Sequence, residues 1–397
     1  MKKWGIFLLL PVLILGQPEF FGYFESEADV MQLGSERYSF GYNKFRLDVE
    51  ARPSDNVLIG ADVIIQKYWG QTTWNIYDFL PGYSDFDLIQ NIELQDTILV
   101  DNIYMRLSFP WADLTLGRQQ ISPGVGYAWN PTDIFNTKSL LDPSYEQTGV
   151  SSIRIYLPLG NRSALNGVVQ PESTWGKSTK QLWLKTGLSR FDVDITLAEL
   201  QQATPTSMVY GDAFDVKRTL AGGTIVGELL EWGLWIEAAQ NTLDTLVSIS
   251  PLGPAASHDP LSIQIDKTYL EYVIGIDHTF DNSIYIVGEY LHNGFGSKDK
   301  SQLGLHDYLY SLTGESTSLM QDYAFLYAMH PTFDFVTLST LVIANFNDNS
   351  GTFAPQLDWN AFEDTNISLQ GSLFWGDDDT EFGLQDWGLR LRVRSDF

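Results

Sequence analysis

The sequence predicts an all-β fold, a transmembrane antiparallel up-and-down β-barrel of about eighteen strands, with sixteen strands as the alternative count. Three observations support this fold class. Apolar and polar residues alternate in one segment after another, the connections between these segments alternate in length, and the last residue is the aromatic Phe397. Strands that alternate in this way have two different faces, as strands between lipid and a lumen must have.

The alternation is clearest in three segments. Residues 44–51 read K-F-R-L-D-V-E-A, so their apolar side chains share one face and their charged side chains the other. Residues 190–197 repeat this pattern, and in residues 387–397 apolar positions stand opposite three arginines. A period of two indicates β-strands. The predicted strands are 19–28, 40–51, 56–68, 96–109, 112–120, 149–158, 162–171, 179–189, 190–201, 215–227, 230–241, 267–280, 283–295, 321–330, 332–345, 351–362, 365–375 and 385–397.

The connections carry a second, independent signal. Those after even-numbered strands are short, for example 52–55, 110–111, 159–161, 281–282 and 363–364. Those after odd-numbered strands are often long, as at 69–95, 121–148, 242–266 and 296–320. Membrane barrels have short periplasmic turns, long external loops and an even number of strands. A soluble β-sandwich gives no reason for this alternation.

Aromatic residues recur near the predicted strand ends, where a barrel has its girdles at the two membrane surfaces. Each ring alone is equally consistent with core packing, and only the recurrence favours a girdle. The residues concerned are Tyr68, Trp69, Phe109, Trp111, Trp232, Phe374 and Trp375.

The first residues have the features of a secretory signal peptide. Lys2 and Lys3 precede an apolar run at 6–15, which is too short to span a bilayer. We expect a signal peptide at 1–16 and the barrel at 17–397. A buried N-terminal helix is the alternative.

Charge and composition exclude several other classes. The formal net charge of −26 has the wrong sign for a protein that binds nucleic acid. The chain has no cysteine, which excludes disulfides and a lipid-modified cysteine anchor. Beyond the signal segment, no apolar run reaches the length of about 18 residues that a membrane helix needs.

The whole mature chain resembles porin-type outer-membrane proteins of Gram-negative bacteria. The terminal segment W-G-L-R-L-R-V-R-S-D-F matches the alternating C-terminal pattern of that class, whose final aromatic residue, here Phe397, is read by the outer-membrane assembly machinery. Residues 116–136, L-G-R-Q-Q-I-S-P-G-V-G-Y-A-W-N-P-T-D-I-F-N, followed by L-L-D-P and G-V-S-S-I-R, are similar to a segment in a group of largely uncharacterised porin-like barrels. The resemblance implies a fold and an outer-membrane location, and it does not identify a solute.

In porins the third external loop folds into the lumen and narrows it. The resemblance implies the same for the connection 121–148, with an ordered surface loop as the alternative. The polar candidates of this constriction loop are Asn130, Asp133, Asn136, Lys138, Asp142 and Glu146.

Strand parity assigns many charged residues to the pore, because the face opposite the lipid-facing one lines the lumen. The predicted basic wall lies near the seam of the barrel and in the N-terminal half: Lys44, Arg46, Arg106, Arg154, Lys185, Arg390, Arg392 and Arg394. The predicted acidic wall comes later in the chain: Asp192, Asp194, Glu237, Glu271, Asp277 and Glu289. Asp48, Glu50 and Asp62 are acidic exceptions among the basic strands.

Two interpretations of these walls stay open. Opposed walls produce a field across the lumen, and charge at a constriction with low-dielectric walls sets ion preference. Alternatively, the arginines pair with inward carboxylates such as Asp48 and Glu50 and form a structural network.

We expect no catalysis and no cofactor. Barrel phospholipases pair a serine with a nearby histidine on the outer face, and none of the five histidines stands two residues before a serine. Omptin-like proteases need inward Asp/His pairs, whereas the adjacent Asp277 and His278 point to opposite faces. Asp377, Asp378 and Asp379 are weak candidates for Ca²⁺ or Mg²⁺, because three consecutive carboxylates more often form a solvated loop tip.

The first functional hypothesis is a passive diffusion channel for small hydrophilic solutes with a charged constriction. The alternatives are a surface adhesin or structural barrel with a plugged lumen, and a conduit for polymer export. The expected partners are outer-membrane lipid and lipopolysaccharide, the outer-membrane assembly machinery and the solutes, with no nucleic acid. A homotrimer stays open, because lipid-facing and subunit-facing apolar surfaces look alike in sequence.

Overall fold

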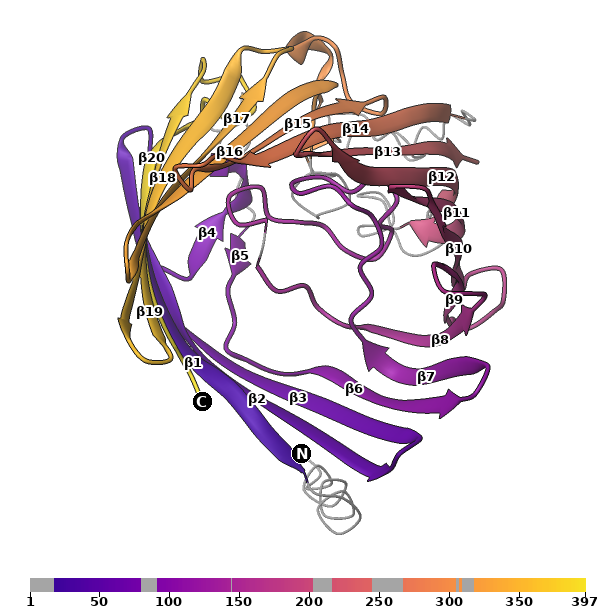
Figure 1. The fold of residues 1–397 in the computed structure, drawn as a ribbon. Helices are drawn as coiled ribbons and strands as arrows, with labels where there is room; N and C mark the ends of the chain where they lie inside the picture. The colour runs from indigo at the N-terminus through magenta and orange to yellow at the C-terminus, as the bar shows by residue number, and fades with distance from the viewer. Residues whose placement is uncertain are drawn as a thin grey trace.

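Eighteen antiparallel strands form one closed sheet in the computed structural model (Figure 1). The structure describes residues 18–79, 91–143, 145–202, 216–244, 267–304, 307–308 and 318–397. The barrel strands are β1 Glu19–Leu33, β2 Glu36–Ser54, β3 Val57–Gly70, β6 Thr97–Phe109, β7 Ala112–Gln119, β8 Val150–Pro158, β9 Ser163–Gln170, β10 Thr179–Leu188, β11 Phe191–Gln202, β12 Val216–Leu229, β13 Trp232–Leu243, β14 Lys267–Thr279, β15 Tyr285–Asn293, β16 Asp322–Phe333, β17 Val336–Asn345, β18 Ser350–Phe362, β19 Thr365–Trp375 and β20 Gln385–Asp396. The connections contain a small sheet of β4 Thr73–Asn75 and β5 Asn91–Glu93, and the 3-10 helices η1 Ile76–Phe79 and η3 Lys300–Gln302.

The predicted eighteen-stranded barrel is confirmed, and the alternative count of sixteen is wrong. The largest difference in strand bounds is in β1, which was predicted to end at residue 28 and continues to Leu33. A turn of two residues, Gly34 and Ser35, then leads into β2. The strand continues because the inward carboxylate of Asp29 pairs with Arg390 across the seam at 3.0 Å. Asp29, whose charge taken by itself suggests a loop, therefore belongs to a paired strand.

β20 closes the barrel against β1, with Ala28 opposite Leu391. The terminal Phe397 extends this pairing: its N–H donates to the Gly22 carbonyl (3.0 Å), and the Gly22 N–H donates back to the Phe397 carbonyl (3.1 Å). The Phe397 ring stacks on Phe45 of β2 with 5.8 Å between centroids. The residue predicted as an assembly signal thus lies in the seam of the barrel, and its role in assembly stays a prediction.

The two faces of each strand differ, as β14 illustrates. Leu270, Ile274 and Ile276 are 40–49 % exposed on the outer face, whereas Val273 on the inner face is fully buried. Such exposed apolar side chains recur around the barrel on most strands. A continuous outer belt of this kind is stable against hydrocarbon and would be unfavourable in water. No helix among the described residues is long and apolar enough to cross a membrane.

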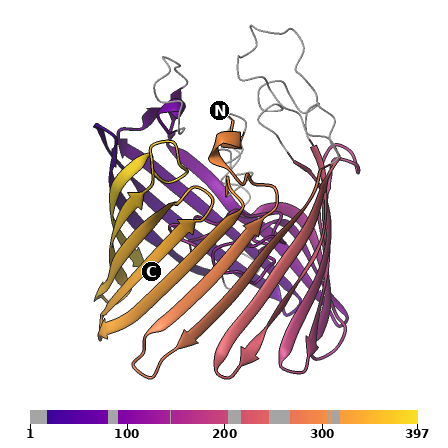
Figure 2. The ribbon, with the colours of Figure 1, turned by 90° about the horizontal axis from the view of Figure 1, so that it is seen from above.

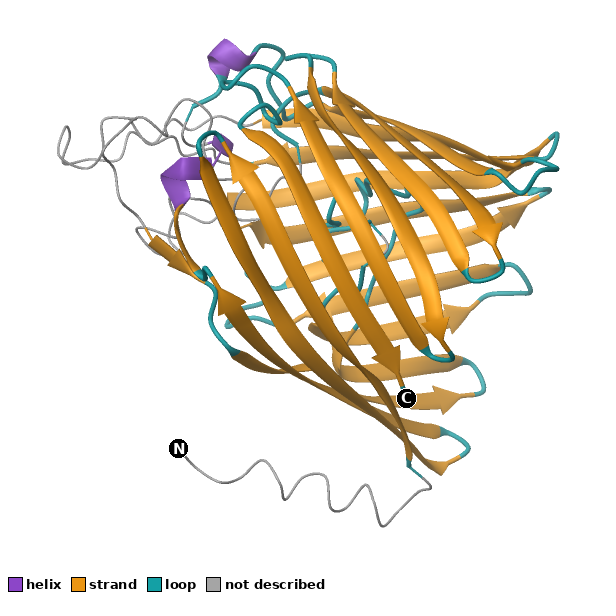
Figure 3. Ribbon diagram, turned by 90° about the vertical axis from the view of Figure 1, so that its left-hand side faces the viewer, coloured by secondary structure: helices purple, strands orange, loops and turns teal. Residues whose placement is uncertain are grey.

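The two ends of the barrel also differ. At one end of the barrel the connections are tight turns, such as Pro110–Trp111 and Glu363–Asp364, and the longer connections gather at the other end, which also has the short turn Gly34–Ser35 (Figures 2 and 3). The described part of the long connections includes 120–143 and 145–149, which join β7 to β8. The predicted alternation in connection length therefore reflects a difference between the two ends of the barrel.

The largest hydrophobic cluster lies inside the barrel rather than between layers. Inward residues of β14 to β17, such as Val287 and Ile343, are fully buried. Trp129, which comes from the β7–β8 connection, packs on Tyr323 and Phe325 of β16 with centroids 6.1 and 6.2 Å apart. This apolar contact seats the connection against one sector of the inner wall.

Candidate functional site

The connection between β7 and β8, described at residues 120–143 and 145–149, lies inside the barrel (Figure 1). We call it the lumen loop. Its first half contacts β13 and β15, and its second half contacts β19, β20, β1 and β2. The loop is therefore held by several sectors of the wall.

Two carboxylates from the wall hold the first half of the lumen loop. Glu237 of β13 is fully buried and accepts hydrogen bonds from the backbone N–H groups of Val125 (2.7 Å), Gly126 (3.3 Å) and Thr132 (2.7 Å). The Thr132 hydroxyl donates to it as well, at 2.7 Å. A buried carboxylate is stable only when it is hydrogen-bonded in this way.

Glu289 of β15 does the same for the next turn of the loop. It accepts from the N–H groups of Tyr127 and Ala128, the latter at 2.7 Å, and from the indole N–H of Trp235 at 2.7 Å. Glu237 and Glu289 together form what we call the first anchor. Both were predicted to belong to an acidic pore wall. In the structure, their carboxylates accept hydrogen bonds from the backbone of the lumen loop.

The turns of the loop are braced internally. Asp133 accepts hydrogen bonds from the N–H groups of Phe135 (2.9 Å) and Asn136 (3.1 Å). Lys138 donates to the carbonyls of Gly126 (2.6 Å) and Tyr127 (3.0 Å). Burial raises the pKa of Asp133 to about 7 and lowers the pKa of Lys138.

One position of the loop requires glycine because of its backbone conformation. Gly124 has φ +97°, a conformation that side chains with a Cβ rarely adopt. A Cβ there would lie 3.0 Å from the Glu237 carboxylate. The glycine therefore lets the chain turn beside the first anchor.

Ion pairs hold the second half of the lumen loop. Asp142 pairs with Arg392 of β20 at 2.8 Å. Glu146 accepts from the Tyr23 hydroxyl (2.7 Å) and pairs with Arg46 (3.1 Å) and Arg394 (3.4 Å). We call Glu146 with these three partners the second anchor. Burial acts to raise the pKa of Glu146, but the Tyr23 hydrogen bond and the nearby cations hold it below its usual range.

The seam arginines also have partners on the wall itself. Arg46 pairs with Asp48 (2.9 Å) and with Asp62. Arg392 pairs with Glu27 of β1 at 2.6 Å. Lys44 is buried and donates to the Tyr145 hydroxyl at 3.0 Å.

Most of these partners were not predicted from the sequence. Asp48 and Glu50 were predicted, and Glu50 lies 3.9 Å from Arg52 instead. The alternating carboxylates at positions 25, 27 and 29 were the available signal, since they stand opposite arginines 394, 392 and 390 in the seam. The predicted first strand, 19–28, included positions 25 and 27 and left out only Asp29.

Three cations of the predicted basic wall differ from those of the seam. Among the described residues, no carboxylate lies within 4.0 Å of Arg106, Arg154 or Lys185. Arg106 is exposed on the inner face of β6. Arg154 donates to Asn166 (3.1 Å) and lies over the Trp183 ring at 5.7 Å.

Arg106 and Arg154 stand at one level of the barrel. Both face Thr115 in the register, Arg106 from β6 and Arg154 from β8, on the two sides of β7. Lys185 is nearer the tight-turn end, opposite Asp194. The two guanidinium groups are therefore a local positive patch on the lumen face.

The other predicted acidic-wall residues have varied surroundings. Asp192 pairs with Arg162 at 2.7 Å, Asp277 accepts from the Tyr285 hydroxyl at 2.7 Å, and Glu271 lies 3.7 Å from Arg218. One carboxylate oxygen of Asp194 is buried and has no hydrogen-bond partner among the residues that the structure describes.

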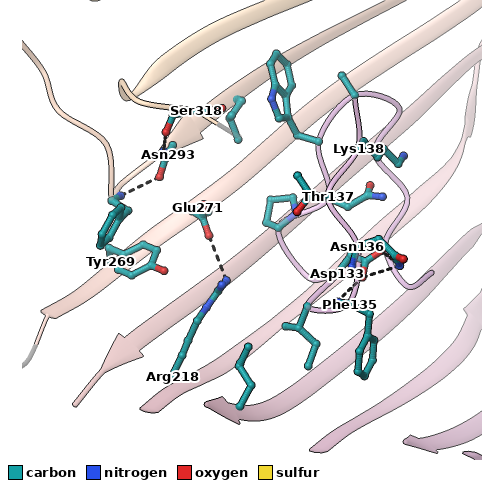
Figure 4. Close-up of a pocket in the computed structure, with 18 of the residues that line it drawn as sticks. Asp133, Phe135, Asn136, Thr137, Lys138, Arg218, Tyr269, Glu271, Asn293 and Ser318 are labelled. Atoms are coloured by element: carbon teal, nitrogen blue, oxygen red, sulfur yellow. Dashed lines mark hydrogen bonds and ion pairs between the residues drawn. The ribbon is translucent and has the colours of Figure 1, made fainter. Parts of the chain in front are cut away.

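A cavity of 320 Å³ lies between the lumen loop and β12 to β15 (Figure 4). Loop residues 128–138 line one side. The other side is lined by Arg218 of β12, Tyr269 and Glu271 of β14, and Asn293 of β15. We call this space the vestibule cavity.

The remaining candidates carry no site in the described part of the chain. Asp377 and Asp379 lie 3.6 and 2.6 Å from Lys300, so these two exposed carboxylates share one ammonium group. No group of three or more histidine or acidic side chains among the described residues could hold a metal ion. His278 stacks on Trp232 at 4.4 Å, while His258 and His306 lie outside the described residues.

Comparisons with known proteins show similarity at the level of fold. No family model and no curated protein matches the chain, so the resemblance of residues 116–136 to a particular group of barrels stays a prediction. Among solved structures, OccAB1 of Acinetobacter baumannii is 10 % identical with a TM-score of 0.59, over 96 % of both chains.

Two structures from Pseudomonas aeruginosa are also similar to this chain. OccK2 (OpdF), solved in complex with glucuronate, is 10 % identical with a TM-score of 0.53, over 96 % of this chain and 98 % of that one. The outer membrane protein OprD is 9 % identical with a TM-score of 0.54, over 96 % of this chain and 94 % of that one. The chain thus has the β-barrel fold of these proteins along nearly its whole length.

Proposed function

We propose that this protein is an outer-membrane channel of a Gram-negative bacterium, through which small hydrophilic solutes diffuse passively. The lumen loop carries the proposal, because two buried carboxylates of the wall hold its backbone inside the barrel. The outer apolar belt fits a bilayer, and OprD, which has this fold, is an outer membrane protein. No reaction is part of this function.

We infer that the channel prefers anionic solutes. The seam arginines are neutralised by carboxylates, whereas Arg106 and Arg154 have no carboxylate within 4.0 Å among the described residues. A positive patch between low-dielectric walls attracts anions to the pore. The similar structure of OccK2 contains glucuronate, an anionic sugar.

The partners follow from this location. The outer belt contacts lipid and lipopolysaccharide, the signal peptide at 1–16 directs export, and Phe397 addresses the assembly machinery. Residues 1–17 lie outside the described part of the chain. Whether copies associate as trimers is tested by the number of closing steps in a single-channel recording.

Planar-bilayer recording under a salt gradient tests the channel and its preference together. The double variant Arg106→Ala/Arg154→Ala is expected to shift the reversal potential toward cations while conductance persists. Arg52→Ala/Lys67→Ala is the matched control, because it also removes two positive charges, from side chains 70 and 75 % exposed near the strand ends. An unchanged reversal potential in the first variant contradicts the anion preference.

The second candidate is a structural or adhesive barrel whose lumen is plugged. The anchoring of the lumen loop at several sectors of the wall favours it. Liposome swelling with sugars of graded size separates the two candidates. A folded barrel that admits no solute supports the plug and contradicts the channel.

A further inference from the structure

Three charged side chains lie together on the outer face of the barrel, near the end with the longer connections. Lys180 is the second residue of β10, Lys217 is the second residue of β12, and Glu199 lies between them near the end of β11. The next residues along β10 and β12 face inward, since Gln181 donates to the lumen loop and Arg218 lines the vestibule cavity. Because successive side chains of a strand point to opposite faces, the three charged residues lie on the outside.

Two ammonium groups share one carboxylate in this group of residues, which we call the outer-face cluster. Lys180 Nζ lies 2.6 Å from one carboxylate oxygen of Glu199, and Lys217 Nζ lies 3.0 Å from the other. The adjacent connection between β9 and β10 adds one acidic and one basic residue, Glu172 and Lys177, which leaves the balance unchanged. The cluster is therefore locally positive, in a chain whose formal net charge is −26.

The two ammonium groups keep donors beyond these contacts, because each has three N–H groups. Lys180 donates to Glu199 and, at 3.0 Å, to the Trp175 carbonyl, which leaves it one donor. Lys217 contacts Glu199 alone among the described residues, which leaves it two. Partly exposed ion pairs of this kind contribute little to stability. Both lysines can therefore turn to a further anionic acceptor without a large cost.

The cluster lies where the apolar outer belt ends. On the same face, two residues nearer the tight-turn end, Leu182 and Leu197 are 46 and 56 % exposed. Trp175 is 69 % exposed, and the Lys180 ammonium lies 4.9 Å from the centre of its ring. An exposed tryptophan and lysines at the border of an apolar belt are typical of the headgroup level of a bilayer. Since the longer connections of a membrane barrel are external, this level belongs to the outer leaflet.

We propose that the outer-face cluster is a binding site for a phosphate group of lipopolysaccharide, the lipid of the outer leaflet. A phosphate monoester carries a charge of about −1.5 to −2 at pH 7 and has three strong acceptor oxygens. These features match the excess positive charge of the cluster and the donors that Lys180 and Lys217 have left. The inference rests on the proposed outer-membrane location and not on the passage of solutes.

Binding of lipid A, the phosphorylated anchor of lipopolysaccharide, to the detergent-solubilised barrel tests the proposal by native mass spectrometry and by titration with a fluorescent lipid A. A chelator is present, because acidic residues elsewhere would otherwise bind lipid phosphates through shared divalent cations. Lys180→Gln/Lys217→Gln should weaken binding about fivefold for each ammonium group removed. Arg52→Gln/Arg190→Gln is the matched control, because it removes two positive charges from exposed side chains at the tight-turn end and should bind like the wild type.

Glu199→Gln should act in the opposite direction. It removes the competing carboxylate and keeps both lysines, so lipid A should bind more tightly. Glu228→Gln is its matched control, because Glu228 is exposed near the other end of β12. Heat-modifiable migration on gels verifies that each variant folds, and Lys217→Gln alone replaces the double variant if that one does not fold. Wild-type protein that binds no lipid A overturns the proposal, as does a lysine variant that binds like the wild type or Glu199→Gln that binds more weakly.

Two further probes separate a lipid site from a site for free phosphate. Inorganic phosphate alone should compete poorly, because the acyl chains of lipid A also pack on the apolar belt beside Leu182 and Leu197. Inorganic phosphate that displaces lipid A at equal concentration overturns the assignment to a lipid. Lipid A without its phosphates that binds as tightly as intact lipid A overturns the assignment to a phosphate.

The outcome is independent of permeation, because binding to the outer face in detergent requires no open pore. A barrel that binds lipid A through the cluster and passes no solute contradicts the channel, while the site stands. A barrel that conducts ions and binds no lipid A contradicts the site alone.

Discussion

The two anchors of the lumen loop use carboxylates in opposite ways. In the first anchor, Glu237 and Glu289 belong to the wall and accept hydrogen bonds from the backbone of the loop. In the second anchor, Glu146 belongs to the loop and pairs with side chains of the wall. The first depends on buried hydrogen bonds and the second on partly exposed ion pairs. The two should therefore respond differently to mutation, salt and pH.

The largest effect is expected when the first anchor is removed. Glu237→Ala leaves three backbone N–H groups and one hydroxyl without their acceptor, and a hydrogen bond to a charged group contributes about 1.5–3 kcal/mol. The loop should detach, with higher conductance, stronger current noise and faster proteolysis between residues 121 and 136. Glu199→Ala is the control, because Glu199 pairs with Lys180 and Lys217 rather than with the loop. Quiet, unchanged currents in Glu237→Ala would contradict this role.

A smaller effect is expected at the second anchor. Glu146→Gln removes ion pairs that contribute up to about 1 kcal/mol each where they are partly exposed. Current noise should rise at low ionic strength, and the difference from wild type should shrink as salt screens the pairs. Recording at graded salt concentrations measures this. Equal salt dependence for Glu237→Ala and Glu146→Gln would remove the distinction between the anchors.

The two halves of the loop should also differ in pH dependence. Burial raises the pKa of Asp133 to about 7, so its protonated form is favoured in the folded loop. Its stabilising contribution is complete below the ordinary value of 3.8 and is lost as the pH rises through about 7. Glu146 has a lowered pKa, so its contribution is present above the ordinary value of 4.5 and is lost only in more acidic solution.

Current noise should therefore increase between pH 5 and pH 8 as Asp133 loses its proton. Asp133→Asn, which stays neutral, should flatten this profile, whereas Glu146→Gln should leave its shape unchanged. Single-channel recording across this range is the measurement. A profile that is the same in wild type and Asp133→Asn would show that another group titrates.

The smallest effect concerns the far end of the barrel. Leu230 and Glu231 form a two-residue turn with φ of 52° and 66°, which suits Asn-Gly better than these residues. Leu230→Asn/Glu231→Gly should stabilise the barrel by about 1 kcal/mol, measured by urea unfolding in detergent. Conductance and noise should stay at wild-type values, since this turn contacts neither anchor. A change in noise would indicate that the two ends are coupled.

The strand pattern was predictable because it is local. A side chain on a strand points to lipid or to the lumen according to the parity of its position, and alternating sequence reveals that parity without knowledge of any partner. The count of eighteen strands followed from it. β1 was predicted too short because Asp29 is explained only by Arg390, which is 361 positions away.

The roles of the charged residues were not predictable in this way. Parity placed Glu237 and Arg106 on the lumen side and could not tell that the first holds backbone amides while the second has no carboxylate within 4.0 Å among the described residues. The partners of Glu237 are main-chain groups more than 100 positions away, and every residue except proline carries such a group. No pattern of side chains in the sequence therefore predicts these main-chain partners.

The sequence by itself thus determined the barrel, the parity of its faces and the unequal lengths of its connections, since each follows from neighbours along the chain. The tertiary structure alone decided where the lumen loop runs, which charges are neutralised and where the vestibule cavity forms. The physical reason is that the energy of a charge depends on the groups packed around it. In a closed barrel those groups come from strands that are remote in sequence.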